Sequence, residues 1–505
     1  MRRVILRNSA SGMGQQLVRI VLLFVAVPLF IKDLGPERYG IFSLLSVLGN
    51  LNGFVGLGLN TALTKYVAEQ GKSRESDHDF IVTVLLQVAL LLPASLVVIF
   101  FGRYVVTGVL GVPAHYYAEV HFLFVTLVVA NGLILIGQSM TGVLDALQRV
   151  DLKNYLQLVY NLSYWSLILV ALFFSPSLAS VGAAILLSAI LWFVLVSFFV
   201  FREYGKLEFT GFNRNFRRVA RKQVHYGARV YAGGLIGFFY EPLSKILVSH
   251  FIGVTDVGFF DIALRLRSVL WGLVSQIFYP LFPLMSQEKD KSKVRLYVHD
   301  IEQKVFLVVL PLVAVIVFAL PSFVNLWLRQ NGSIIAFTSV IIISFHLVGS
   351  STVIPNYQFL LAKDLPQKTI ILQSSNVIFN SAVFLATVHF LGYYALILAN
   401  MTAITSSFLL SLYYQHRYLQ SLIFDSRKQL FDVAVVFLAD LGVAAAVRYV
   451  VHPEWLRIGL IPMAVVFSTI LMYRWTRLVK TADVDRYLGK SGSARELALK
   501  VLVAR

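Results

Sequence analysis

Apolar segments of about 20 residues recur along the 505-residue chain, and they restrict the possible fold more than any other feature. A helix of that length crosses the roughly 30 Å hydrocarbon core of a membrane. Only 14% of the residues are charged and 58% are hydrophobic, too little polar surface for a soluble protein of this size. The sequence therefore predicts an all-α polytopic membrane protein and excludes a soluble enzyme, a secreted domain and a nucleic-acid-binding protein.

We expect fourteen transmembrane helices joined by short polar connections. The predicted spans are 11–32, 37–58, 79–101, 117–138, 154–174, 179–201, 229–251, 258–284, 303–324, 335–360, 368–390, 393–414, 429–450 and 455–475. The longest connection is basic and follows the sixth span. The predicted organisation is an N-terminal six-helix lobe (1–201), a basic cytoplasmic linker (202–228), a C-terminal six-helix lobe (229–414), helices 13 and 14 (415–476) and a cytoplasmic tail (477–505).

The basic residues of the connections predict the orientation of the helices. If the N-terminus is cytoplasmic, 34 Lys and Arg residues fall on the cytoplasmic side and six on the outer side. Cytoplasmic loops of membrane proteins carry such an excess of Lys and Arg. Both termini are therefore predicted to be cytoplasmic.

The chain also contains an internal repeat. Residues 34–42 (LGPERYGIF) match residues 252–260 (IGVTDVGFF), and residues 147–153 match residues 361–367 more weakly. An even number of spans separates the copies, so the two lobes share one orientation. We expect an axis along the membrane normal to relate them, as in several transporters.

These motifs resemble the polysaccharide transporter family of the multidrug/oligosaccharidyl-lipid/polysaccharide exporter superfamily. The similar stretches are residues 15–69, with Leu34-Gly35-x4-Gly40, and residues 258–265, which fit a Gly-x-aromatic-x-x-Ala-x-basic pattern ending at Arg265. The first copy departs from this pattern, because it has Val47 where the second copy has Arg265. The resemblance covers about residues 1–415.

The resemblance implies a transporter and not an enzyme. Its cargo would be an oligosaccharide on a polyprenyl diphosphate, moved across the bacterial inner membrane by alternating access for the synthesis of surface polysaccharide such as the O-antigen of lipopolysaccharide. A polysaccharide polymerase would be a partner. Two alternatives within the superfamily stay open, a lipid II flippase and a cation-coupled multidrug exporter. A membrane scaffold without transport is a third, and the buried charges described next argue against it.

Ionisable side chains inside predicted spans are costly and usually face protein or a water-filled cavity. We predict that four basic residues bind the diphosphate of the substrate, since Arg in particular holds such a group through two hydrogen bonds: Arg19, Lys245, Arg265 and Arg267. Glu241, Asp261 and Asp440 are candidates for ion coupling. The alternative is that Glu241–Lys245 and Asp261–Arg265, each spaced i,i+4, are neutral pairs that join helices.

Asp440 has no basic residue within one turn, so it is expected to accept a hydrogen bond from a neighbouring helix or to titrate during transport. His346 is expected to make a polar contact. In the linker, Phe212, Phe216, Val219 and Ala220 predict an amphipathic surface helix whose Arg and Lys residues attract anionic lipids. The chain has no Cys and no phosphate-binding loop, so the sequence predicts no cofactor and no metal site.

Overall fold

The computed structural model describes residues 2–49, 58–210, 212–275, 290–329, 332–363, 365–421, 426–479 and 493–503, and the single residues 278, 285, 288, 423, 424 and 481. The second half of the second predicted span and the end of the eighth lie outside the described residues. In the described part, the chain is helical and contains no strand. The prediction of an all-α polytopic membrane protein is confirmed.

The chain forms two compact units, Met1–Asp261 and Ile262–Arg505, which divide within one helix. The helices of unit 1 are α1 (Arg2–Gly49), α3 (Leu59–Gln70), α4 (Arg74–Arg103), α5 (Tyr117–Ala146), α6 (Val150–Phe174), α7 (Leu178–Tyr204), α8 (Phe212–Phe251) and the start of α9 (Val254–Ser275). Those of unit 2 are the rest of α9, α11 (Lys291–Leu328), α12 (Gly332–Ala362), α13 (Pro366–Leu391), α14 (Tyr394–Leu419), α15 (Arg427–Val450), α16 (Glu454–Thr476) and α18 (Ser493–Leu502).

Ten helices of the described chain are long and apolar enough to cross a membrane, and each coincides with a predicted span. The other four predicted spans lie on the two arms of α1, on the second part of α8 and on α9. Three of these segments carry the charges that the sequence analysis selected, namely Arg19, the Glu241–Lys245 pair and the charges of α9.

Both copies of the first repeat place a glycine with positive φ where two helical segments join. Gly35 has φ +81°, where α1 bends between its two arms, and Gly253 has φ +151° between α8 and α9. Side chains other than hydrogen are disfavoured at such angles. The second glycines of the two copies touch, because a Cβ built on Gly258 would lie 3.2 Å from Gly40 Cα. The predicted repeat therefore corresponds to two glycine turns that pack against each other.

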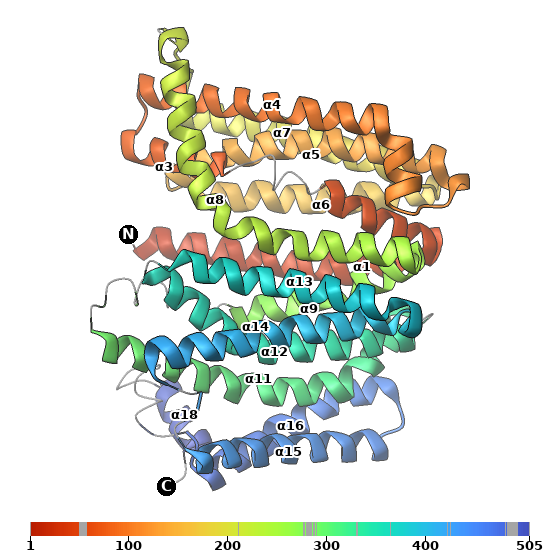
Figure 1. Ribbon diagram of the computed structural model, residues 1–505, viewed down its shortest axis with the longest axis vertical. Helices are drawn as coiled ribbons and strands as arrows, with labels where there is room; N and C mark the ends of the chain where they lie inside the picture. Colours follow the sequence, from red (N-terminus) through yellow and green to blue (C-terminus); the bar gives the residue numbers. More distant parts are fainter. Residues whose placement is uncertain are drawn as a thin grey trace. The chain divides into compact units, whose positions relative to one another are not determined.

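In unit 1, α5 lies against α3, α4 and α7, and α6 lies against α1 and α7 (Figure 1). Their contact surface is a cluster of buried apolar side chains that includes Leu63, Phe80, Leu144 and Trp192. The first part of α8 crosses the ends of α3 and α4 steeply, whereas its second part runs along α1 (Figure 1). One continuous helix thus forms both the linker and the seventh predicted span.

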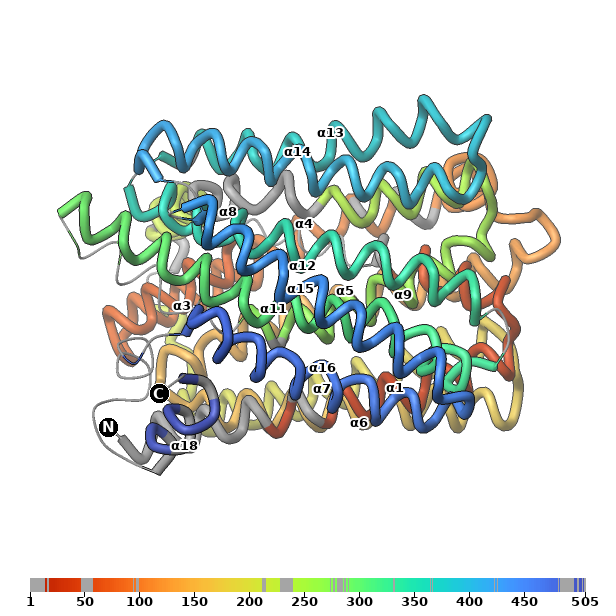
Figure 2. The backbone as a smooth tube through the Cα atoms, turned by 90° about the horizontal axis from the view of Figure 1, so that it is seen from below, coloured from red at the N-terminus to blue at the C-terminus, as the bar shows by residue number. Residues whose placement is uncertain are grey.

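In unit 2, α12 packs against α11 and α14, and α13 runs beside α14 (Figure 2). Helices α15 and α16, which correspond to the predicted spans 13 and 14, pack against α11. Small residues, Ala314 and Ala319 of α11 and Ala444 of α15, are buried there beside Ile461 and Val465 of α16. Small side chains let transmembrane helices approach closely.

Candidate functional site

Three charged side chains and a tyrosine form a buried cluster in unit 1. Lys245 Nζ lies 2.6 Å from Asp261 Oδ1 and 3.1 Å from Glu241 Oε1. Tyr39 Oη donates a hydrogen bond of 2.8 Å to Asp261 Oδ2. Lys245 is 1% exposed and Asp261 is 3% exposed, whereas the Glu241 side chain is 41% exposed. One ammonium group therefore faces two carboxylates, of which only Glu241 reaches solvent.

Local sequence explains how these side chains meet. Glu241 and Lys245 are one turn apart on α8 and share a face. The Gly253 turn folds α9 back along α8, which brings Asp261 to the depth of Lys245. Tyr39 directly precedes Gly40, and the close contact of Gly40 with α9 lets the tyrosine reach Asp261.

The structure thus joins Glu241, Lys245 and Asp261, three of the predicted site residues. Helical spacing offers Asp261 to Arg265 of its own helix, and in the structure Asp261 also contacts Lys245 of α8. In this conformation a phosphate group reaches Lys245 only by replacing a carboxylate, because the ammonium group is buried and engaged by both.

The three predicted arginines lie in different surroundings. Arg19 is exposed on α1 in unit 1, while Arg265 and Arg267 are half-buried on α9 in unit 2. The positive charge of Arg267 acts on the ring of His346 in α12. That ring packs edge-on against Trp271, with 5.0 Å between the ring centroids.

A cavity of about 290 Å³ adjoins His346 in unit 2. Its lining combines apolar side chains with hydroxyl, phenol and amide groups from α12, α13 and α14: His346, Gly349, Ser350, Val353, Ile354, Tyr357, Leu372, Gln373, Asn376, Ile404 and Ser407. His346 Nδ1 and Asn376 Oδ1 have no hydrogen-bond partner in the described chain. Amide and hydroxyl groups next to apolar surface suit a ligand with many hydroxyl groups.

Asp440 joins the two helices that follow the repeat. It is fully buried on α15, and Thr469 of α16 donates a hydrogen bond of 2.8 Å to Asp440 Oδ2. The expected contact with a neighbouring helix is therefore present. Asp440 Oδ1 has no partner in the described part of the chain.

A second buried acidic cluster holds the linker against α4. Asp77, 1% exposed, accepts hydrogen bonds from Tyr204 Oη at 2.8 Å and from the Glu208 backbone N–H at 3.0 Å. Asp79, also 1% exposed, pairs with Lys222 Nζ at 3.0 Å and accepts a bond from Gln223 Nε2 at 3.1 Å. The two carboxylates therefore bind both the segment before α8 and the first part of α8.

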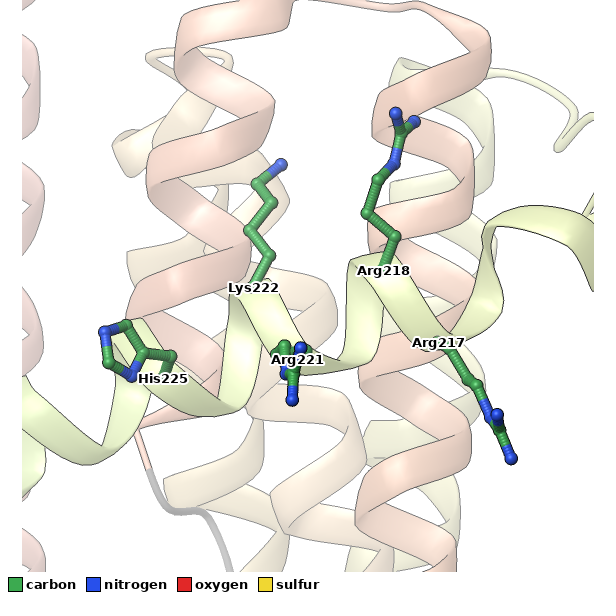
Figure 3. Close-up of a pocket in the computed structure, with 5 residues that line it drawn as sticks. All are labelled: Arg217, Arg218, Arg221, Lys222 and His225. Carbon is green, nitrogen blue, oxygen red and sulfur yellow. The ribbon is translucent and has the colours of Figure 1, made fainter.

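The first part of α8 has one buried face and one basic face. Val219, Gln223 and Gly227 are buried at i,i+4 spacing, so Val219, predicted to face the membrane, lies instead in the protein interior. An open pocket of about 860 Å³ is lined by Arg217, Arg218, Arg221, Lys222 and His225. Arg218 and Lys222 point to one side of α8, and Arg217 and Arg221 to the other (Figure 3).

Tyr66 of α3 also contacts Lys222 of α8. Lys222 Nζ lies 3.6 Å from the centroid of its ring. Partial burial, together with the negative charge of Asp79, raises the pKa of the Tyr66 hydroxyl. Lys222 is thus engaged, whereas no acidic side chain in the described chain pairs with Arg217, Arg218 or Arg221.

Sequence patterns indicated neither Tyr39 nor the cavity, and His346 is the one lining residue that they singled out. The available signal for the cavity was the helical spacing of His346, Ser350 and Tyr357 on an otherwise apolar helix. For Tyr39 the only signal was its place beside the second glycine of the turn. Among the described residues, no three His, Asp or Glu side chains are placed to hold a metal ion.

Comparison with known proteins connects this geometry to a family. The family described as "Polysaccharide biosynthesis protein" matches residues 5–289. A candidate O-antigen transporter of Shigella flexneri is 19% identical over 349 residues, which cover 68% of this chain and 81% of the relative.

Solved structures show the same fold. The lipid II flippase MurJ in an inward closed conformation has a TM-score of 0.72 at 12% identity, over 92% of this chain and 98% of MurJ. An inward-facing multidrug resistance transporter of the MATE family, in the MOP superfamily, has a TM-score of 0.62 at 15% identity, over 80% of this chain and 99% of that chain.

These proteins are transporters and not enzymes, in agreement with the sequence analysis. The family match covers more than half of the chain, and it falls on the turns, α8 and α9 that form the buried cluster. The chain belongs to the polysaccharide biosynthesis protein family and is a multi-pass membrane flippase or exporter with the fold of the MOP superfamily.

Proposed function

We propose that this protein moves a polyprenyl-diphosphate-linked oligosaccharide across the bacterial inner membrane by alternating access. The main support is the cavity of unit 2, which places amide and hydroxyl groups next to His346. Sugar hydroxyls are the groups that such a lining binds best. The product would serve cell-surface polysaccharide such as O-antigen, which agrees with the family and with the Shigella relative.

Arg19, Arg265 and Arg267 are the proposed contacts of the diphosphate, together with Lys245 when a carboxylate is released from it. Glu241 is the strongest candidate for ion coupling, because it is the half-exposed acid of a buried cluster. Asp261 and Asp440 are further candidates, each engaged by a hydrogen-bond donor in this conformation. Outward movement of a negatively charged cargo is also favoured by an inside-negative potential, by about 2.3 kcal/mol per charge per 100 mV.

Export should depend strongly on Arg265. We expect Arg265→Ala to abolish export of the lipid-linked oligosaccharide while the protein stays in the membrane, because water does not replace a bidentate guanidinium contact. The measurement is surface polysaccharide in cells whose own exporter is deleted, normalised to the amount of protein. Arg427→Ala is the matched control, since Arg427 is exposed at the start of α15 and has no proposed role. Full export by Arg265→Ala would reduce Arg265 to a structural role.

Both termini are proposed to be cytoplasmic. Because the chain has no cysteine, single cysteines report the side of the membrane directly. We expect His115→Cys to react with an impermeant maleimide in intact cells, and Arg74→Cys to react only after permeabilisation; both positions are exposed. Labelling of Arg74→Cys in intact cells would invert the proposed orientation.

Anionic lipids are proposed to bind the basic face of α8. Arg217, Arg218 and Arg221 are exposed on it and have no acidic partner in the described chain. Each such charge contributes about 1 kcal/mol of attraction to an anionic membrane surface. The polysaccharide polymerase is the proposed protein partner, since it would consume the exported oligosaccharide.

Transport of lipid II is the second candidate function. The specific observation in its favour is the structural similarity to the lipid II flippase, with a TM-score of 0.72. Depletion of a cell's own lipid II flippase distinguishes the two. Growth rescue by this protein would favour lipid II, whereas rescue of surface polysaccharide alone would favour the first proposal.

A further inference from the structure

Unit 2 contains a buried carboxyl group that none of the preceding roles uses. Glu302 of α11 is fully buried. Its Oε1 accepts a hydrogen bond of 3.1 Å from Asn356 Nδ2 of α12, and its Oε2 accepts one of 2.5 Å from Gln415 Nε2 of α14. Three helices of the same unit thus meet at one carboxyl group.

The orientation of both amides follows from their other contacts. Asn356 Nδ2 also donates to the Thr352 carbonyl at 3.0 Å, which fixes nitrogen and not oxygen on that side. The same Nδ2 donates to Gln415 Oε1 at 3.3 Å, so Gln415 must present its nitrogen to Glu302. Both carboxyl oxygens therefore face N–H donors. A metal cation of the hard kind needs oxygen ligands, so this arrangement suits a proton rather than a metal.

No charged side chain balances Glu302 in the described chain. On α11, His299 lies nearly one turn earlier, while Asp300 and Lys304 lie about 160° and 200° around the helix from Glu302. On α14, His416 and Arg417 are exposed, as are Arg427 and Lys428 at the start of α15 and Arg474 near the end of α16.

Helix α12 carries no charged residue within three turns of Asn356, apart from Lys363 and Asp364 just beyond its end, of which Lys363 donates to the backbone carbonyls of Met285 and Glu288. Asp364 and Asp425 lie outside the described residues. Burial favours the neutral acid and the two amide donors favour the carboxylate. The two tendencies oppose each other at a single group.

A short path connects this group to an open pocket. Gln415 Nε2 lies 3.5 Å from Ser421 Oγ. Ser421 lines a pocket of about 500 Å³ together with Ser292, Arg295, Leu296, His299, Gln420 and Phe424. Gln415 thus contacts both Glu302 and Ser421 of the pocket wall. An amide does not release protons readily, so Gln415 closes the path unless it rotates.

We propose that Glu302 is a proton-binding site that exchanges with this pocket when the Gln415 side chain rotates away. A hydronium ion in the pocket transfers a proton to Glu302 Oε2: one of its O–H bonds breaks and leaves water, and the new O–H bond gives the neutral acid, which then no longer accepts the hydrogen bond from Gln415 Nε2. Given the proposed function, the site couples proton movement to the export cycle. Only this coupling rests on the proposed function.

The test is infrared difference spectroscopy of the full-length purified protein titrated with acid, without substrate. Acid protonates many of the 26 Asp and Glu side chains, so the expected signal is one component of the carboxylic-acid carbonyl band that is present in the native protein and missing from Glu302→Gln. Asp440→Asn is the matched control, because Asp440 is also a fully buried acid of unit 2; it should leave the Glu302 band in place. A spectrum of Glu302→Gln identical to that of the native protein would overturn the proposal.

Gln415→Leu provides a second test if Glu302→Gln fails to fold. Loss of one donor to the carboxylate should shift the appearance of the carbonyl band to higher pH, and an unchanged titration would contradict the proposed site. Both measurements are independent of cargo. A titrating Glu302 in a protein that exports no oligosaccharide would refute only the proposed function, and export without a titrating Glu302 would refute only the proton site.

Discussion

Lys245→Met should cause the largest loss of folded protein among single substitutions in unit 1. The methionine removes the ammonium group that faces Asp261 at 2.6 Å, and Asp261 is 3% exposed. Removal of one partner from a buried ion pair typically costs about 3–5 kcal/mol. We expect the variant to be nearly absent from membranes, as measured by the amount of detergent-extracted monodisperse protein.

The burial of the two carboxylates predicts which second substitution restores folding of the Lys245→Met variant. Lys245→Met with Asp261→Asn should recover most of the protein, because the asparagine is uncharged and still accepts the hydrogen bond from Tyr39. Lys245→Met with Glu241→Gln should not, because Glu241 is 41% exposed and already hydrated, while the charge on Asp261 stays buried. Equal recovery by both double variants would show that the two carboxylates destabilise the Lys245→Met variant to the same extent.

The same double variant addresses transport. If Lys245 binds phosphate during the cycle, Lys245→Met with Asp261→Asn should be well folded and inactive in export. Normal export by that variant would assign Lys245 to helix packing and leave the three arginines as the contacts of the diphosphate.

The transmembrane helices could be predicted from sequence because each lies on a long apolar segment that is recognisable without knowledge of the tertiary structure. The Gly-x4-Gly repeat was also readable, since glycine is the residue that a left-handed turn or a close backbone approach requires. That the second glycines touch each other was not readable, because it depends on how two helices 218 residues apart pack.

The composition of the site and the Glu241–Lys245 pair could be predicted, but the contact of Lys245 with Asp261 could not. The i,i+4 spacing predicts pairs within one helix, Glu241 with Lys245 and Asp261 with Arg265. It gives no information on which other helix packs against α8 or α9. The pairing of Lys245 with Asp261 arises from the Gly253 turn. Glu302 was overlooked for a simpler reason, because it lies one residue before the predicted start of its span and was assigned to a polar connection.

Loss of Asp79 should detach the first part of α8 from α4. Asp79 is 1% exposed and accepts bonds from Lys222, Gln223 and Gln70. Asp79→Ala leaves those donors facing a small apolar side chain. Because the Lys222 side chain is 35% exposed and can turn to water, we expect a cost at or below the low end of the range for broken buried pairs, about 3 kcal/mol.

The absence of native cysteine makes this detachment measurable at a single position. Val219→Cys places a thiol on the buried face of α8, where the native side chain is 7% exposed. Reaction with maleimide requires exposure of the thiol. We expect slow labelling of Val219→Cys alone and fast labelling when Asp79→Ala is added, while Arg218→Cys on the exposed face should label fast in both backgrounds.

Glu208→Ala is the matched control, because Glu208 is 60% exposed and pairs with Arg74 at the surface, where ion pairs contribute about 0–1 kcal/mol. It should leave Val219→Cys protected. If Asp79→Ala also leaves it protected, the buried apolar face of α8 alone holds the linker, and the acidic cluster has another role. If the thiol becomes reactive, the contact between α4 and α8 depends on one carboxylate, and the same helix carries Lys245 in its second part. A movement of α8 after release from Asp79 would then be transmitted along the helix to the buried cluster around Lys245.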